Sequence, residues 1–358
     1  MIKLQTSEFQ KAVTKVEKGA GKNALLPITE MIGIKIKDNT MSIYATDGAN
    51  DMKYIINDVN SDDISITVKA ETLAKLMNKV TSEIVELNVT EDYLEIKANG
   101  TYKLPLEVDE NGVIDFPEIK FNIPDTELNA TTHTNVLSAI AVNKSALSVD
   151  YTKPELTGYY VGDCIMTSDQ EVITKNDIWF SKDESEPMLI NEKMMYLLSL
   201  AESEEIKFYR QDGKLYFFTD KLVVCGAEMA EIEDFPIDIL NTFIETEFNS
   251  SCKIPKLLLI DVLERLQIFI ESYDENGAIF TFTDDGLNIS SKKSSSIEII
   301  KYNETNEFKP YTCTLNIPKF KELLKSNPSD TITIHYGNDN AIKITTDKVT
   351  QILAVMGE

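Results

Sequence analysis

The chain has few of the residues from which most catalytic and metal sites are built. It contains two histidines, His133 and His335, and four scattered cysteines that form no Cys-x-x-Cys pair. Zinc sites and disulfide scaffolds need closely spaced ligands, and a Ser-His-Asp relay would need distant residues to converge. The sequence therefore predicts no metal centre, no cofactor and no catalytic site.

Long apolar runs are also absent. No stretch of 18 apolar residues occurs, and the N-terminal MIKLQTSEFQ lacks the apolar segment of a signal peptide. We therefore expect a cytoplasmic protein with no membrane partner.

Positive charge is scarce, because 35 Lys and Arg face 59 Asp and Glu and the net charge is −24. Evenly spread negative charge would repel nucleic acid. The cations, however, are concentrated in the predicted helices, which hold 14 Lys and Arg against 7 Asp and Glu, so the rest of the chain carries −31. These predicted helices span residues 8–22, 69–79, 134–148, 191–201, 255–267 and 317–326.

The chain repeats itself. Residues 66–106, 188–229 and 313–356 each read as a strand, an amphipathic helix and three alternating strands, and the segments before them repeat the same order. Ile84, Ile206 and Ile332 take the same place in the three copies. We expect an α+β protein of three repeated domains, residues 1–123, 124–248 and 249–358, each with two helices on curved antiparallel sheets.

Lysines recur along one side of several predicted helices. The first helix carries four at spacings of 4, 3 and 4, which places them along one flank. A lysine row on one helix is usually a solvated face. Its recurrence on equivalent helices favours a surface that attracts a duplex without reading bases.

Several segments resemble those of the bacterial sliding clamp, the β subunit of DNA polymerase III. They are LLPITEMIGIKI (25–36), IYATDGANDM (43–52), DFPEI (115–119), ELTG (155–158), DFPID (234–238) and IPKFKELLKS (317–326). The similarity spans the whole chain, and its specificity lies in the combination of these segments with a threefold repeat.

This resemblance implies the DNA clamp fold and a head-to-tail homodimeric ring around double-stranded DNA. Such a clamp is not an enzyme. It is opened by a clamp loader, tethers the replicative polymerase and acts in the cytoplasm at the nucleoid and replication fork. The residues expected to face DNA are Lys11, Lys15, Lys18, Lys22, Lys75, Lys79, Lys144, Lys319, Lys321 and Lys325.

The resemblance also implies two protein-binding surfaces. Polymerase and loader insert short linear peptides into a pocket between the second and third domains, and the dimer joins edge strands of the first and third. The pocket residues carried over are Leu156, Thr167, Val172, Pro236, Leu240, Asn241, Ile352 and Ala354, and the dimer residues are Lys103, Leu104, Leu106, Ile268 and Phe269. TSDQEV (167–172) and the ending LAVMGE depart from the family pattern, and SSKKSSSIEII (290–300) offers only Glu298 as an acidic interface residue.

One alternative remains open on the residues alone. An acidic, β-rich scaffold that binds proteins but never DNA would have the same composition and the same repeats. Reversing the charge of the helix lysines separates the two interpretations, because only a DNA clamp depends on those charges.

Overall fold

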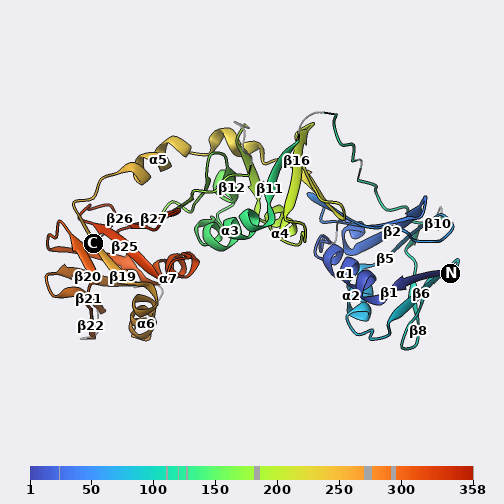
Figure 1. Cartoon of the computed structure of the whole chain (residues 1–358), viewed down its shortest axis with the longest axis horizontal. Helices are drawn as coiled ribbons and strands as arrows, with labels where there is room; N and C mark the ends of the chain where they lie inside the picture. The colour runs from blue at the N-terminus through green and yellow to red at the C-terminus, as the bar shows by residue number, and fades with distance from the viewer. Residues whose placement is uncertain are drawn as a thin grey trace. The chain divides into compact units, whose positions relative to one another are not determined.

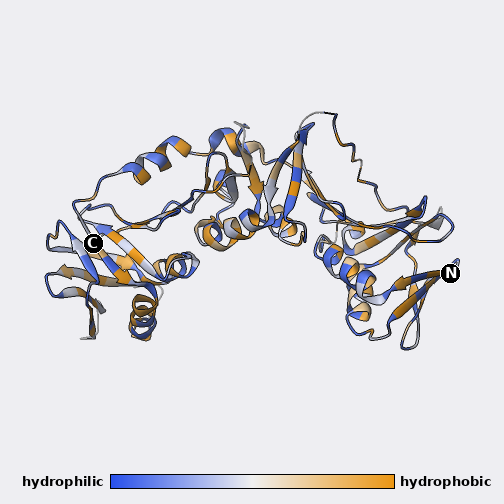
Figure 2. Cartoon of the chain, viewed as in Figure 1, coloured by the Kyte–Doolittle hydropathy of each residue, from blue (hydrophilic) through white to orange (hydrophobic). Residues whose placement is uncertain are grey.

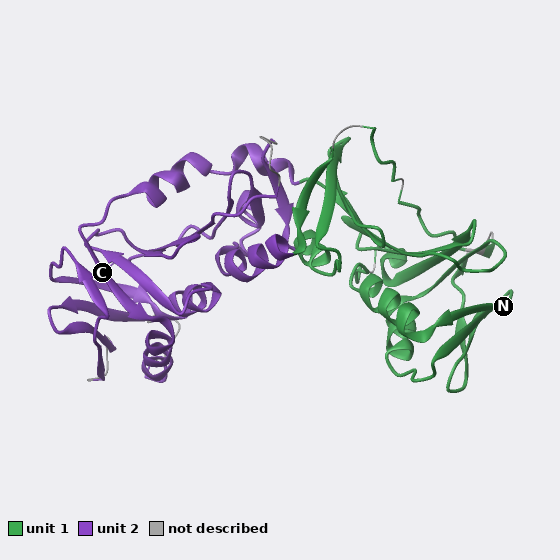
Figure 3. Ribbon diagram, in the orientation of Figure 1, with its two compact units in different colours: residues 1–133, 193–228 green, residues 134–192, 229–358 purple. Residues whose placement is uncertain are grey.

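The computed structural model describes residues 1–23, 25–109, 112–119, 121–125, 128–180, 186–269, 276–291 and 296–357. It forms two compact units, of which unit 1 comprises residues 1–133 and 193–228 and unit 2 comprises residues 134–192 and 229–358 (Figure 1, Figure 3). The expected join at residues 121–127 lies partly outside the described residues. Each unit is described by itself.

Unit 1 contains three antiparallel sheets. An eight-stranded sheet has the order β11 (Asn129–Thr132), β16 (Glu205–Gln211), β17 (Lys214–Phe218), β18 (Leu222–Ala227), β4 (Asn50–Ile56), β3 (Thr40–Thr46), β2 (Met31–Lys37), β5 (Ile64–Lys69). A four-stranded sheet has the order β1 (Ile2–Gln5), β6 (Ile84–Val89), β7 (Tyr93–Lys97), β8 (Thr101–Pro105), and β9 (Val108–Asp109) pairs with β10 (Gly112–Val113). The pairing of β18 with β4 therefore joins segments that are far apart in the sequence.

Unit 2 contains two antiparallel sheets. The larger has the order β15 (Met188–Asn191), β12 (Gly158–Val161), β13 (Ile165–Ser168), β14 (Val172–Asn176), β27 (Val349–Ala354), β26 (Ala341–Thr345), β25 (Thr331–Tyr336), β19 (Ser250–Pro255), β23 (Glu304–Asn306). The smaller has the order β22 (Ile297–Ile300), β21 (Gly286–Ser291), β20 (Gly277–Thr283), β24 (Tyr311–Asn316). Here β14 pairs with β27 and again joins distant segments.

The helices follow the amphipathic pattern of the sequence. The α-helices are α1 (Thr6–Glu17), α2 (Ala70–Met77), α3 (His133–Asn143), α4 (Glu192–Leu198), α5 (Ile237–Glu245), α6 (Lys256–Gln267) and α7 (Ile317–Ser326). Short 3₁₀ turns are η1 (Pro27–Glu30), η2 (Lys144–Ala146), η3 (Pro154–Leu156) and η4 (Ala230–Asp234). In α1 the buried residues Phe9, Val13 and Val16 face the sheet, and polar residues fill the opposite side (Figure 2).

Within the described residues the same order, a strand, a helix and three strands, occurs six times along the chain. This confirms the predicted α+β clamp fold. One detail of the repeat is wrong by one residue: Ile84 begins β6 and is exposed, whereas Val85, Ile206 and Ile332 are the buried equivalents. Since strand side chains alternate between faces, a shift of one residue exchanges buried and exposed positions.

Two helix predictions need correction. The helix expected over residues 8–22 ends at Glu17, because Gly19 and Gly21 follow and Lys18 takes the cap position. Lys22 therefore lies beyond the helix. The sequence interpretation also missed α5, which begins directly after the Phe-Pro of DFPID.

Each Phe-Pro segment packs an aromatic ring against its own sheet. The ring of Phe116 stacks on Tyr44 at 6.4 Å, and that of Phe235 stacks on Tyr160 at 4.8 Å. Phe116 occupies the space above Gly33 in β2, where a Cβ atom would collide with the Cβ and Cγ atoms of the phenylalanine. Gly33 thus leaves room for the segment to cross the sheet.

We expect Gly33→Ala to lower the free energy of unfolding by about 1–3 kcal/mol, because the added methyl displaces Phe116 from its site. Urea denaturation followed by circular dichroism measures this change. Gly357→Ala is the matched control, since nothing lies near its Cβ position. Equal stability of the two variants would show that Phe116 is not held against the sheet.

Candidate nucleic-acid interface and partner surfaces

The first group of lysines lies on α1, and a carboxylate holds it in place. Glu202, in the turn after α4, forms ion pairs with both Lys11 and Lys15. The Lys15 ammonium also donates to the Leu200 carbonyl at 2.6 Å and lies 5.9 Å from the Tyr54 ring centre. Burial lowers the pKa of Lys15 although its ammonium donates a hydrogen bond to Glu202. The Lys15 side chain is therefore mostly buried and bonded within unit 1, whereas the Lys11 side chain is half exposed.

The carboxylate at the centre of this group responds to both lysines. Burial raises the pKa of Glu202, but the hydrogen bonds and charges of Lys11 and Lys15 outweigh it, so the pKa lies below its usual 4.5. Glu202 therefore stays ionised at neutral pH and offsets part of the positive charge on α1.

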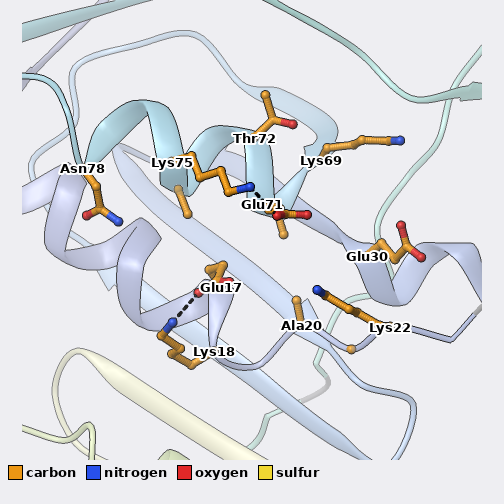
Figure 4. Close-up of a pocket in the computed structure, with 13 residues that line it drawn as sticks. Glu17, Lys18, Ala20, Lys22, Glu30, Lys69, Glu71, Thr72, Lys75 and Asn78 are labelled. Carbon is orange, nitrogen blue, oxygen red and sulfur yellow. Dashed lines mark ion pairs between the residues drawn. The ribbon is translucent and has the colours of Figure 1, made fainter.

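A second group surrounds a cavity of about 470 Å³ between the end of α1 and the start of α2 (Figure 4). Helices α1 and α2 lie side by side, and the lining of the cavity comes from the end of α1, the turn after it and α2. Its charged lining residues are Glu17, Lys18, Lys22, Glu30, Lys69, Glu71 and Lys75. Four ammonium groups against three carboxylates leave this site slightly positive in a chain of strongly negative charge.

The lysines around this cavity are not equally available. Lys18 pairs with Glu17 at 2.9 Å, and Lys75 pairs with Glu71 one helical turn away. Lys22 extends into the space between the turn and α2 (Figure 4). Among the described residues, neither Lys22 nor Lys79 has a carboxylate within ion-pair distance, and both are exposed. These two are the most accessible cations of the predicted interface in unit 1.

The unit 2 lysines are paired in the same way. Lys144 in η2 lies 2.8 Å from Glu192, and Lys325 in α7 lies 3.3 Å from Glu264. Lys321 is mostly buried and contacts Gln267. Each of these contacts must open, or share its lysine, if a phosphate is to bind.

Lys319, also on α7, has two acidic partners. It lies 2.8 Å from Asp169 and 3.0 Å from Glu171, in the turn between β13 and β14. Burial opposes its charge, but the two carboxylates outweigh burial and raise its pKa. TSDQEV, the segment that departs from the family pattern, therefore supplies the partners of this lysine.

An apolar cluster covers the face of the large unit 2 sheet that is opposite α7. Three of the predicted pocket residues, Leu156, Leu240 and Ile352, belong to it and are buried. In Figure 1, α5 runs along β26 and β27 on this side. The other buried members are Cys164, Met166, Ile173, Leu189, Phe235 and Ala341, with Tyr160, Met229, Ile232, Ile237 and Ile244 partly buried around them.

Two predicted pocket residues lie elsewhere. Thr167 donates to the Asn143 carbonyl at 2.8 Å, and Val172 packs into the core under α6 and α7. Strand alternation explains this, because neighbours Met166 and Ile173 take the outer face instead. When the turn at residues 169–171 separates the two strands, alternation within β13 and within β14 places Met166 and Ile173 on the outer face. Pro236, Asn241 and Ala354 are half buried at the margin.

The predicted dimer residues lie at two sheet ends, one in each unit. Leu104 on β8 and Leu106 directly after it are buried, so the outward surface there is formed by Thr101, Lys103 and Pro105. Lys103 donates to the Tyr93 hydroxyl at 3.0 Å.

The unit 2 end is more apolar. Ile268 and Phe269, just after α6, have exposed fractions of 78% and 48%. The edge strand β22 adds Ile297 and Ile299, which the sequence interpretation had not selected. Arg265 of the same unit holds Glu298 through two hydrogen bonds of 2.8 and 2.6 Å, so this carboxylate already has a partner.

The cysteines and the histidine on β25 have structural surroundings. Burial raises the pKa of Cys164 to about 11 and that of Cys225, Cys252 and Cys313 to about 12, which disfavours the reactive thiolate. His335 is hydrogen-bonded to Thr345, and burial lowers its pKa. Within the described ranges, no group of three His, Cys, Asp or Glu could hold a metal ion. No helix there is long and apolar enough to cross a membrane.

Sixfold repetition of strand, helix and three strands, with lysines on the helices, defines the class of protein: the fold is that of the DNA sliding clamps. Residues 1–120 match the family described as "DNA polymerase III beta subunit, N-terminal domain". No curated protein sequence matches the chain.

Solved structures match over the whole chain. The DNA polymerase III beta subunit of Thermotoga maritima has a TM-score of 0.88 at 16% identity, covering 100% of this chain and 99% of that one. The beta subunit of Borrelia burgdorferi gives 0.87 at 16% identity, with 99% of each chain covered. The sliding clamp of Bacillus subtilis gives 0.85 at 14% identity, covering 100% and 99%. The resemblance predicted from the sequence is confirmed, at low identity.

The shared carboxylate of Glu202 gives a pH-dependent prediction. Because its folded pKa is lowered, its stabilising contribution is present above the unfolded value near 4.5 and is lost as the pH falls through the folded pKa. Glu202→Gln should therefore lower the free energy of unfolding at pH 7 by at most about 1 kcal/mol, since the pair is half exposed.

Urea unfolding across a pH series measures this difference from the wild type, which should shrink as the pH falls below the usual glutamate value. Glu204→Gln is the matched control, because Glu204 lies two residues away and has no side-chain ion pair among the described residues. A difference that is constant with pH would contradict the role of the ion pairs.

Proposed function

We propose that this chain is a DNA sliding clamp: two copies close head to tail into a ring that encircles duplex DNA and tethers a DNA polymerase. The observation that carries the proposal is the gathering of lysines on the flank of α1 and α2, in a chain that has the clamp fold and a net charge of −24. It acts as an accessory subunit without chemistry of its own.

Weak attraction suits this function. Phosphate contacts give affinity without sequence information, and many free cations would hold the duplex in one place. Carboxylate partners of Lys11, Lys18 and Lys75 compete with phosphate and keep each contact transient. Retention then comes from the closed ring rather than from affinity, and the tethered polymerase gains a high effective concentration at the DNA.

Three domains per chain, residues 1–123, 124–248 and 249–358, would give the ring six domains, with the helix-bearing faces around the DNA. Ring closure is supported by the apolar character of β22 and the end of α6. An edge strand that exposes Ile297 and Ile299 invites pairing with another chain, and proteins normally cover such an edge. In the ring the partner subunit's β8 edge covers it.

Polymerase and clamp loader are the proposed protein partners, bound through short linear peptides at the outer cluster around Leu156, Leu240 and Ile352. A site on the outer face leaves the helix-bearing face free for DNA. The alternative, an acidic scaffold that never binds DNA, has no use for the lysines around the α1–α2 cavity, and the next experiment separates the two.

Charge reversal at the cavity tests DNA encirclement. The triple variant Lys18→Glu, Lys22→Glu and Lys75→Glu should lower the amount of protein loaded onto nicked circular DNA about tenfold or more, because each change replaces an attraction to phosphate by repulsion while the ring is being placed on the duplex. Gel filtration of protein loaded by its own loader, or by prolonged incubation at low salt, measures retention on circular and linear DNA.

The control reverses Lys37, Lys207 and Lys214, three exposed lysines on the strands of unit 1, for the same change in net charge. Retention of this control on nicked circular DNA should stay at the wild-type level. On linear DNA retention should be lost for both proteins, because rings slide off free ends. Indifference of both triple variants would favour the scaffold.

Dimerisation is tested at the β22 edge. The wild type should have about twice the chain mass of 40.3 kDa by light scattering, and Ile299→Asp should shift it toward the monomer, because a charge would be buried at the interface. Leu25→Asp places the same charge at an exposed leucine of unit 1 and should leave the mass unchanged. A monomeric wild type at micromolar concentration would contradict the ring.

A further inference from the structure

Helix α5 has an apolar stripe that is wider than its contact with the sheet. Its inner side, Ile237, Leu240 and Ile244, follows the i, i+3, i+7 spacing of a buried stripe and packs on the outer cluster against Ala341 and Ile352. A helix of nine residues on a protein surface normally needs only this one stripe. The remaining positions would then be polar.

The apolar stripe of α5 instead continues beyond this inner side. Ile239 and Phe243 lie one turn apart and have exposed fractions of 61% and 43%. We call this pair the α5 ridge. Figure 2 shows the alternation of apolar and polar residues along the helix. The ridge is the flank of the apolar stripe that the sheet leaves uncovered, and no described residue buries it.

The surroundings of the ridge are acidic. From Met229 to Cys252 the chain has no lysine or arginine, whereas it carries six carboxylates, on Glu231, Glu233, Asp234, Asp238, Glu245 and Glu247. With 35 Lys and Arg in 358 residues, a stretch of this length would ordinarily hold two or three cations. One of these carboxylates acts inside the cluster: burial first, then Cys164, Asp163 and Asp238 raise the pKa of Tyr160.

Lys343, a cation at the end of α5, already has hydrogen-bond partners. Lys343 of β26 donates to the carbonyl oxygens of Ile244 and Thr246 at 3.0 and 2.7 Å, at the C-terminal end of the helix. There it satisfies carbonyls that have no partner within the helix, and it complements the helix dipole. Glu247 acts on its charge, but within the described residues no ion pair joins Lys343 to Asp238 or Glu245.

We propose that the α5 ridge extends the peptide site of the outer cluster and takes a partner segment in which apolar residues stand beside lysine or arginine. The apolar residues of the segment cover Ile239 and Phe243, and its cations meet Asp238 and Glu245. This inference rests on the proposed peptide site, since it assigns the chemistry of the segment that binds there. Charge complementarity selects the partner, because an acidic segment would be repelled by the same carboxylates.

Selection from a randomised 12-residue peptide display library, with the full chain as bait, tests the proposal without assuming a sequence. We expect the enriched peptides to carry lysine or arginine next to apolar residues. The double variant Ile239→Ser and Phe243→Ser should bind a fluorescent copy of an enriched peptide about tenfold more weakly or worse, by anisotropy. Asp238→Lys with Glu245→Lys should cause a loss of similar size.

The matched control is Leu257→Ser with Leu258→Ser, which removes two exposed leucines from α6 of the same unit and should leave peptide affinity unchanged. Enrichment of neutral or acidic peptides, or no enrichment, would overturn the inference. So would affinity that falls with Leu240→Ala but not with the ridge variant, although the peptide site itself would then stand. Retention of the ridge variant on nicked circular DNA, after incubation at low salt without the loader, reports separately on the sliding clamp.

Discussion

Backbone pairing between distant segments is the interaction on which the rest of this structure depends. Strand β4 finds its partner in β18, and β14 finds its partner in β27, so separate repeats share continuous sheets. Once the sheets are continuous, one face must take the helices and the other is left for apolar clusters and connecting segments. The sidedness of the chain, with lysines on helices and α5 on the opposite face in unit 2, follows from this pairing.

Carboxylates of this protein limit how strongly its lysines can bind phosphate. The predicted DNA-facing lysines are mostly held by carboxylates of the same unit, as Lys319 is by Asp169 and Glu171. A lysine that already has a partner gives little net affinity to a phosphate, because the gain is offset by the pair that opens. In an acidic chain this arrangement keeps the cations where they are while limiting how strongly any one of them can bind.

Much of the fold could be predicted from the sequence, because it is encoded locally. The spacing of Phe9, Val13 and Val16 predicts α1, and the alternation in the repeats predicts the strands. The helix over residues 317–326 matches α7 at both ends, where Asn316 provides the N-terminal cap. The boundary of α1 was misjudged because the lysine spacing continues past Glu17 although two glycines end the helix.

The site was less predictable, since it depends on contacts between residues far apart in the sequence. Nothing local places Glu202 beside Lys11 and Lys15, which are nearly 200 residues away. Thr167 and Val172 were carried over from a family pattern, and the face on which each lies is decided by strand register, which a shift of one residue reverses. Helix α5 was missed because it lies outside the repeated units, between β18 and β19, although its apolar residues form one wide stripe.

The contact of Phe116 with Gly33 has an evolutionary consequence. The ring fills the space that any other residue at position 33 would need for its own side chain. The two positions can therefore change only together, so a relative with a larger residue in β2 should carry a smaller one in its Phe-Pro segment. Diverging sequences should therefore show paired substitution at these two sites, because the Phe-Pro segment can cross its sheet only where β2 leaves room for the ring.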